Sequence, residues 1–151
     1  MNDLRDLYQE VILEHARKPR NHRALVGDTC RHAAGHNPLC GDKVTVHADV
    51  QGGVVRDVAF EGSGCAISTA SASVMTETVK GRTTAEAEEL FRRFRDLVTG
   101  QGSGLAAAQD LGKLSVFAGV SEFPARVKCA SLAWHVLHAA LAYEHETVTT
   151  E

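Results

Sequence analysis

A short run of alternating apolar and polar residues, followed by two glycines, constrains the fold of this chain more than any other feature. The run reads Lys43, Val44, Thr45, Val46, His47, Ala48, Asp49, Val50. A period of two predicts a strand with one buried face. Gly52-Gly53 predicts a tight hairpin turn into a second strand over Val54–Phe60. With a weaker strand pattern over residues 25–36, we expect a small antiparallel three-stranded sheet.

Helical patterns lie on both sides of this predicted sheet. Five helices are expected, over residues 3–18, Ile67–Val79, Thr83 to about Val98, Leu111–Phe117, and from about Ala125 or Lys128 to Tyr143. The glycine-rich stretch 100–104 is expected to be a surface loop. An order of helix, sheet and helices predicts an α+β fold, and the length suits one domain spanning residues 1–151.

The charge balance and hydropathy exclude several classes of partner. The chain has 16 Lys and Arg against 19 Asp and Glu, a net charge of -3, so it lacks the basic surface expected of a protein that binds nucleic acid or an anionic membrane. No apolar run approaches the roughly 20 residues that span a bilayer. The first residues lack the apolar stretch of a signal peptide, so we expect a cytoplasmic protein, in which cysteines typically bind metals or react.

Three of the four cysteines have neighbours that suit a metal or sulfur site. Cys40 lies in Asn-Pro-Leu-Cys-Gly-Asp, Cys65 in Gly-Ser-Gly-Cys-Ala and Cys129 in Arg-Val-Lys-Cys. Cys65 and Cys129 are expected at or near the N-termini of helices, which favour thiolates. Asp42 lies two residues after Cys40. Three thiolates and one carboxylate form a plausible tetrahedral site for Zn²⁺, or for iron in a cluster.

Residue chemistry alone leaves a second interpretation open. Cysteine is among the most frequently buried residues, so three unrelated core cysteines would give the same sequence. The spacing matches no zinc-finger pattern. If the site is real, the oxygen of Asp42 is a weaker ligand than a fourth thiolate would be, which indicates a site that exchanges its contents.

Four separate segments resemble, in order, the NifU/IscU/SufU family of iron–sulfur cluster assembly proteins. They are Leu7–His15 with Lys18–Asn21, Asn37–Asp42, Gly62–Ser68, and Val127–His135. The resemblance implies a small antiparallel sheet covered by helices. It also implies that Cys40, Asp42, Cys65 and Cys129 are the metal or cluster ligands.

Within that family, three features are more similar to the SufU type than to the IscU scaffold type. Lys128 stands where scaffold members have a histidine, residues 123–128 keep only fragments of a Leu-Pro-Pro-Val-Lys chaperone segment, and the stretch 81–120 is long. The resemblance implies a zinc-bound partner of a SufS-type cysteine desulfurase. It would take persulfide sulfur on Cys40 and pass it to the downstream SUF cluster-assembly machinery, as a sulfurtransferase-like acceptor rather than a conventional multi-turnover enzyme.

Two other functions remain open at this point. The first is a scaffold that assembles an iron–sulfur cluster on Cys40, Asp42, Cys65 and Cys129, and the second is a plain zinc-stabilised binding module. The remaining candidates are interpreted as structural or exposed residues, namely Cys30, His32, His36, His47, His135 and His138. Tyr8 is interpreted as a core or interface aromatic, and Arg126 and Lys128 as cations that could steer a partner.

Overall fold

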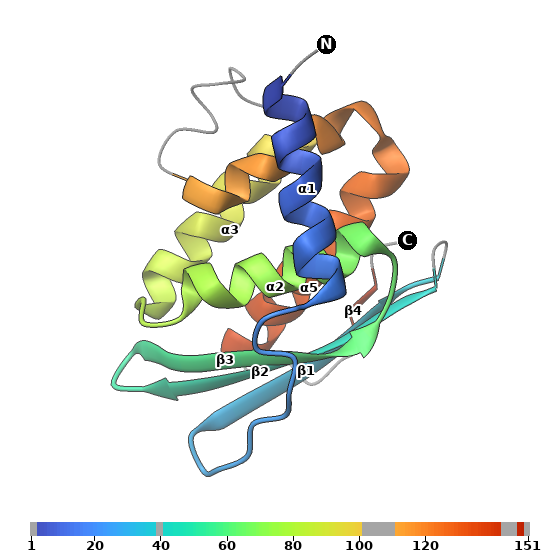
Figure 1. Cartoon of the computed structure of the whole chain (residues 1–151). Helices are drawn as coiled ribbons and strands as arrows, with labels where there is room; N and C mark the ends of the chain where they lie inside the picture. The colour runs from blue at the N-terminus through green and yellow to red at the C-terminus, as the bar shows by residue number, and fades with distance from the viewer. Residues whose placement is uncertain (1–2, 39–40, 101–110, 143–147, 150–151) are drawn as a thin grey trace.

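A sheet with helices stacked over one of its faces makes up the described part of the chain (Figure 1). The structure is a computed structural model, and it describes residues 3–38, 41–100, 111–142 and 148–149. Its elements are α1 (Asp3–Arg17), β1 (Cys30–Asn37), β2 (Asp42–Gln51), β3 (Val54–Ser63), α2 (Ala66–Val79), α3 (Thr84–Thr99), the 3-10 helix η1 (Gly112–Glu122), α5 (Pro124–Leu141) and β4 (Val148–Thr149).

The sheet contains the predicted antiparallel hairpin, β2–β3, with β3 at one edge. Its strand order is β3-β2-β1-β4, in which β2 pairs antiparallel with both β1 and β3. Gly52 and Gly53 form the turn with φ of 60° and 78°, a conformation that favours glycine. The two-residue strand β4, which the sequence did not predict, pairs in parallel with β1. The expected α+β fold with three antiparallel strands is confirmed.

The predicted start of the first strand at residue 25 is wrong. The chain turns at Gly27, where φ is 142°, and the Cys30 amide donates to the Gly27 carbonyl at 3.2 Å. This turn delays β1 until Cys30. The outward-facing residues of β1 alternate with buried ones, as the pattern in β2 does.

The helices form two layers above the sheet. In Figure 1, α2 and α5 lie against the sheet, whereas α1, α3 and η1 lie farther out. Aromatic rings join the outer helices to α5, because Phe94 stacks on Trp134 at 5.1 Å between centroids and meets Phe117 edge-on at 5.7 Å. All three rings are fully buried. Among the described residues, no helix combines the length and apolarity needed to cross a membrane.

The helix boundaries differ from the predictions in two places. α5 begins at Pro124 rather than at Ala125 or Lys128, because proline is preorganised for the first helical position. η1 continues to Glu122 rather than ending at Phe117. The capping box at the start of α3 is confirmed, since the Thr83 hydroxyl accepts from the Glu86 amide and the Glu86 carboxylate accepts from the Thr83 amide.

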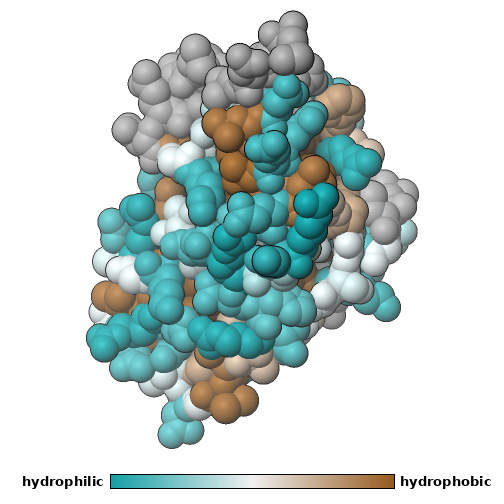
Figure 2. All heavy atoms as spheres, viewed as in Figure 1, coloured by the Kyte–Doolittle hydropathy of each residue, from teal (hydrophilic) through white to brown (hydrophobic). Residues whose placement is uncertain are grey.

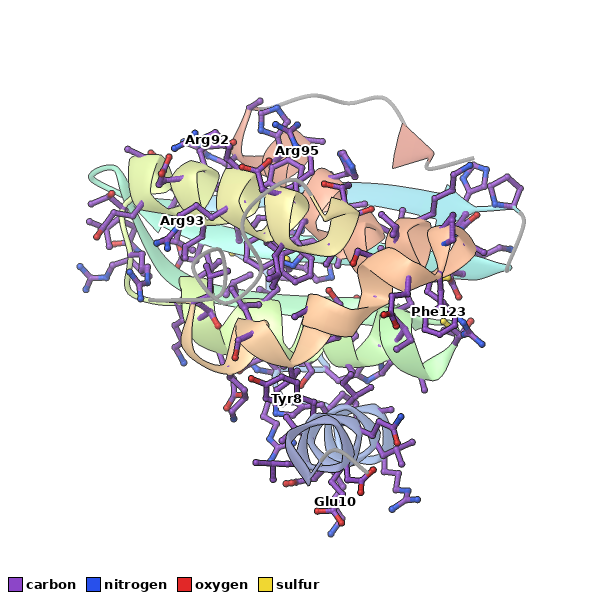
Figure 3. All side chains as sticks on the ribbon, turned by 90° about the horizontal axis from the view of Figure 1, so that it is seen from above. Tyr8, Glu10, Arg92, Arg93, Arg95 and Phe123 are labelled. Carbon is purple, nitrogen blue, oxygen red and sulfur yellow. The ribbon has the colours of Figure 1, made fainter. Side chains whose placement is uncertain are left out.

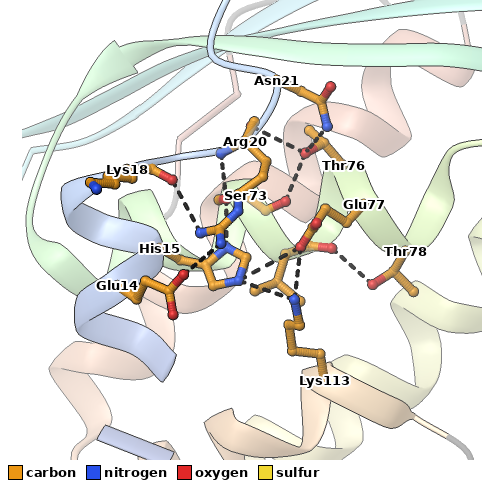
Figure 4. Close-up of polar contacts among 11 residues, drawn as sticks. Glu14, His15, Lys18, Arg20, Asn21, Ser73, Thr76, Glu77, Thr78 and Lys113 are labelled. Atoms are coloured by element: carbon orange, nitrogen blue, oxygen red, sulfur yellow. Dashed lines mark hydrogen bonds and ion pairs between the residues drawn. The ribbon is translucent and has the colours of Figure 1, made fainter. Parts of the chain in front are cut away.

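A buried polar network attaches α1 to α2 (Figure 4). His15 is only 1% exposed, and its Nδ1 lies 2.7 Å from the Ser73 hydroxyl, which also accepts from the Arg20 amide at 2.8 Å. Its Nε2 faces Glu77 and Lys113 at 3.6 and 3.4 Å. Burial lowers the pKa of His15 below its usual value, and the nearby cations of Arg20 and Lys113 lower it further.

This network predicts a loss of stability in acid that depends on His15. Because the pKa of His15 is lower in the folded state, the unfolded chain binds the proton more tightly. Stability is therefore highest above about pH 6.5 and falls as the pH drops toward the folded-state pKa. We expect His15→Gln to lose less stability than the wild type between about pH 7.5 and 5.5 in urea unfolding. His22→Gln, which removes an exposed imidazole, is the control, and equal losses in all three proteins would contradict the assignment.

Candidate metal centre

The structure brings three of the four predicted site residues together. Asp42 begins β2, Cys65 immediately precedes α2, and Cys129 lies in the second turn of α5. One potential ligand atom from each lies within 4.8 Å of the other two, and no other group of this kind occurs among the described residues. Cys40, the fourth predicted residue, lies outside the residues that the structure describes.

The carboxylate of Asp42 is buried and only half of it is hydrogen-bonded. Asp42 has 0% exposure, and its Oδ1 accepts from the backbone amide of Cys65 at 2.8 Å. The other oxygen, Oδ2, is buried and has no hydrogen-bond partner among the described residues. A buried carboxylate oxygen without a partner costs free energy unless a cation lies nearby. Together with two cysteine sulfurs, this oxygen forms a donor set that fits Zn²⁺ or iron.

Cys65 is the N-cap residue of α2, as the sequence predicted. Its sulfur accepts from the Ser68 backbone amide at 3.4 Å, so it satisfies one of the unpaired amides of the first turn. The partial positive charge at a helix N-terminus stabilises a thiolate. Cys65 is also half-buried.

The local environment of Cys129 differs from the expected one. Because α5 begins at Pro124, Cys129 lies beyond the first turn, where the effect of the helix dipole is largely lost. A side chain supplies the hydrogen bond instead, since the Asn37 amide donates to the Cys129 sulfur at 3.8 Å. Both residues have 0% exposure. Sequence reasoning missed this contact.

Gly64 allows the sheet and α2 to approach each other closely. A Cβ added at this position would lie 2.6 Å from Asp42 Oδ1, which is closer than non-bonded atoms approach. Only a residue without a side chain therefore allows Asp42 to reach the Cys65 amide. The sequence placed Gly64 only within the motif around Cys65, and its contact with Asp42 was not predicted.

The remaining candidates lie outside this cluster. Cys30 is half-buried, and burial, with Asp49 and Asp57 nearby, raises the pKa of its thiol, so it is a poor nucleophile. On the uncovered face of the sheet, His47 lies 2.6 Å from His32 and 2.7 Å from Glu61. In the helical layer, His135 packs edge-on against Phe91, and His138 pairs with Glu88. His36 borders a shallow hollow on the open sheet face.

An apolar groove of about 500 Å³ lies beside the cluster, between α1, α2, η1 and the start of α5. Ala66 and Arg126, which are close in sequence to Cys65 and Cys129, are among its lining residues. Tyr8 points from α1 toward η1, whereas Glu10 points away (Figure 3). Two groove residues, Leu13 and Phe123, are 43% and 53% exposed. Figure 2 shows apolar side chains around the N-terminal half of α1.

Comparisons with known proteins agree with the fold and identify the family. The sequence model of the NifU-like N-terminal domain matches residues 7–130. The zinc-dependent sulfurtransferase SufU of Bacillus subtilis is 39% identical over 142 residues, which cover 94% of each chain. The iron–sulfur cluster assembly scaffold protein IscU of Streptococcus pyogenes is 38% identical over 141 residues, 93% of this chain and 86% of the relative.

A solved structure also resembles this chain closely. It is a putative iron–sulfur cluster assembly scaffold protein for the SUF system from Fervidobacterium islandicum. The two superpose with a TM-score of 0.78 at 35% sequence identity, over 87% of this chain and 94% of that one. Similarity at this level extends to the arrangement of the sheet and helices.

The close approach at Gly64 predicts the effect of adding one methyl group. In Gly64→Ala the new Cβ displaces the Asp42 carboxylate from the Cys65 amide, and the lost charge-assisted hydrogen bond lowers the free energy of unfolding by about 1.5–3 kcal/mol. Urea unfolding of the metal-free protein measures this change. Gly119→Ala is the matched control, because a Cβ there has nothing within 4 Å. Equal stabilities of the two variants would show that the contact does not matter.

Proposed function

This chain belongs to the NifU-like N-terminal domain family, and we propose that it is a zinc-bound sulfur acceptor in iron–sulfur cluster assembly. It would receive persulfide sulfur from a SufS-type cysteine desulfurase and deliver it to downstream SUF cluster-assembly proteins. Similarity to the Bacillus subtilis zinc-dependent sulfurtransferase over 94% of both chains supports this choice.

The observation that carries the proposal is the mixed donor set at the cluster. Cys65 and Cys129 bring sulfur ligands, whereas Asp42 brings a buried carboxylate oxygen that no described residue satisfies. Structural zinc sites typically use only cysteine and histidine. A carboxylate among thiolates is the weaker ligand for a borderline-soft metal, which suits a site that opens during its function. This argues against a purely structural zinc module.

Zn²⁺ bound at this site would hold the ligand segments together and keep the thiols ionised. The residues that would hold it are Cys40, Asp42, Cys65 and Cys129. Three of them come from separate elements of the described fold, namely β2, the N-terminus of α2 and α5. We assign the accepting role to Cys40, which only Gly41 separates in sequence from the weaker ligand Asp42.

The transfer step balances without an oxidant or a reductant. The Cys40 thiolate attacks the outer sulfur of the desulfurase persulfide, a cysteine bearing –S–SH. A new sulfur–sulfur bond forms at Cys40 while the original one breaks, and the desulfurase cysteine leaves as a thiolate. The proton stays on the transferred sulfur or passes to water. Cys40 then carries the persulfide.

The apolar groove gives the desulfurase a surface to bind next to the cluster. Leu13 and Phe123 expose large apolar side chains there, and clustered exposed apolar surface typically marks a protein interface. Arg126 lines the groove and lies three residues before Cys129 in the sequence. A partner seated in the groove would therefore have its reactive cysteine near the thiols of the site.

An iron–sulfur scaffold is the second candidate function. The similar IscU of Streptococcus pyogenes is named as a scaffold, and iron in a cluster accepts the same sulfur and oxygen donors. Lys128, which stands where scaffold members of the family have a histidine, favours sulfur transfer. The two functions differ in their product, a persulfide on one cysteine or a cluster on all four ligands.

Sulfur transfer predicts that this protein, loaded with zinc, accelerates a SufS-type desulfurase. Turnover should rise on adding the wild type, and mass mapping should locate the added sulfur on Cys40. Cys40→Ser should bring turnover back to the level without the protein, because the accepting nucleophile is lost. Cys30→Ser, which removes a thiol outside the cluster, is the matched control and should stimulate like the wild type. An absence of stimulation, with a cluster forming from iron and sulfide, would establish the scaffold function instead.

Docking in the groove predicts that a charge at Phe123 weakens the complex with the desulfurase. Phe123 is the N-cap residue of α5 and makes no side-chain cap, so aspartate, a preferred N-cap residue, fits the helix. We expect Phe123→Asp to bind about 30-fold more weakly, as for loss of an aromatic hot spot. Its zinc content should match that of the wild type. Val26→Asp is the control, because Val26 is also apolar, is 90% exposed and lies outside the groove. It should bind the desulfurase as tightly as the wild type does, and equal losses of affinity in the two variants would contradict docking in the groove.

A further inference from the structure

Asn37 occupies a fixed position between the sheet and the cluster. It is the last residue of β1, where it pairs with Asp42 of β2. Its backbone carbonyl accepts from the Gly41 amide at 2.9 Å. With 0% exposure, the side chain is held among packed neighbours, and its amide Nδ2 donates to the Cys129 sulfur at 3.8 Å. A polar side chain from the sheet thus reaches a sulfur on α5.

The two described cysteines of the cluster receive different hydrogen bonds. Cys65 is half-buried and accepts from a backbone amide at a helix N-terminus. Cys129 is fully buried and accepts from the side chain of Asn37. The donor to Cys65 is the backbone amide of residue 68, which every residue except proline supplies, whereas the Asn37 donor to Cys129 depends on the identity of residue 37. The hydrogen bond from Asn37 to Cys129 can therefore be removed by a single substitution.

We propose that Asn37 is a positioning residue that makes Cys129 the permanent, unreactive ligand of the site. Its N–H donor stabilises negative charge on the Cys129 sulfur, which lowers the nucleophilicity of that thiolate and fixes its orientation. Sulfur chemistry is thereby directed to the more reactive thiols. The direction of sulfur transfer rests on the proposed function, but the hydrogen bond and its effect on metal binding do not.

A purely structural role for Asn37 would have different consequences. If the side chain only filled space, replacing it would change stability and leave the electronic properties of the Cys129 sulfur as they are. The test therefore needs a signal that comes from the sulfur itself. Thiolate-to-Co²⁺ charge-transfer absorption gives such a signal, because hydrogen bonds to a metal-bound sulfur lower the energy of its lone pairs.

The first experiment compares Co²⁺-loaded wild type with two substitutions of Asn37. Asn37→Leu keeps the approximate size and removes the donor, and Asn37→Ser leaves a hydroxyl too short to reach the sulfur. We expect both to shift the charge-transfer band to lower energy. Ser131→Ala is the matched control: Ser131 is also buried, lies two residues after Cys129, and donates to the Val127 carbonyl at 2.8 Å rather than to sulfur. Its band should coincide with that of the wild type.

The second experiment measures the reactivity of each thiol in the zinc-loaded protein. Iodoacetamide labelling is followed over time, and each cysteine is identified by peptide mass mapping. Without the Asn37 donor, labelling of Cys129 should rise at least about threefold. A hydrogen bond to a charged group changes basicity by at least about tenfold, and thiolate nucleophilicity follows basicity with a slope of about 0.5. Labelling of Cys65, which has its own backbone donor, should not change.

These outcomes separate the inference from the proposed function. An unchanged band and unchanged Cys129 labelling in both Asn37 variants would overturn the role of Asn37, whatever the desulfurase does. If Asn37→Leu does not fold, as judged by circular dichroism, Asn37→Ser decides. If the band shifts and labelling rises while the wild type fails to stimulate the desulfurase, Asn37 keeps its role and the sulfur-acceptor function fails.

Discussion

The hydrogen bond from the Cys65 amide to Asp42 joins the two halves of this molecule at the point where its candidate chemistry lies. Asp42 belongs to the sheet, and Cys65 caps the helix that covers it. One carboxylate oxygen holds the start of α2 against β2, and the second stays available to a cation. The placement of the Cys65 sulfur, and of every residue that follows it in α2, depends on this contact.

Packing farther from the site fixes the third member of the cluster. α5 lies across β1 and β2 (Figure 1), and its buried Trp134 stacks on both Phe91 and Phe94 of α3. Because these rings fix the helix in place, Cys129 meets Asn37 although 92 positions separate them in the sequence. The cluster is therefore a product of the helical layers as much as of the sheet. A change in the aromatic core would reach the sulfur through α5.

Local patterns were read from the sequence more reliably than contacts between distant segments. The hairpin could be predicted because alternation and a Gly-Gly turn are local signals, and so could the position of Cys65 before α2. The second-turn position of Cys129 was missed, because Pro124 starts the helix earlier than the apolar pattern indicates. The Asn37 contact has no local signal at all, since it depends on how α5 crosses β1. Cys40 lies outside the described residues, so its predicted place stays a prediction.

Positions 42 and 64 form a coupled pair in any redesign of this site. A carboxylate at 42 that reaches the Cys65 amide requires glycine at 64, and a side chain at 64 is compatible only with a shorter or displaced group at 42. Replacing Asp42 by another ligand residue therefore changes which residues are tolerated at position 64. The residues at positions 42 and 64 therefore have to be changed together, although the β2–β3 hairpin separates them in the sequence.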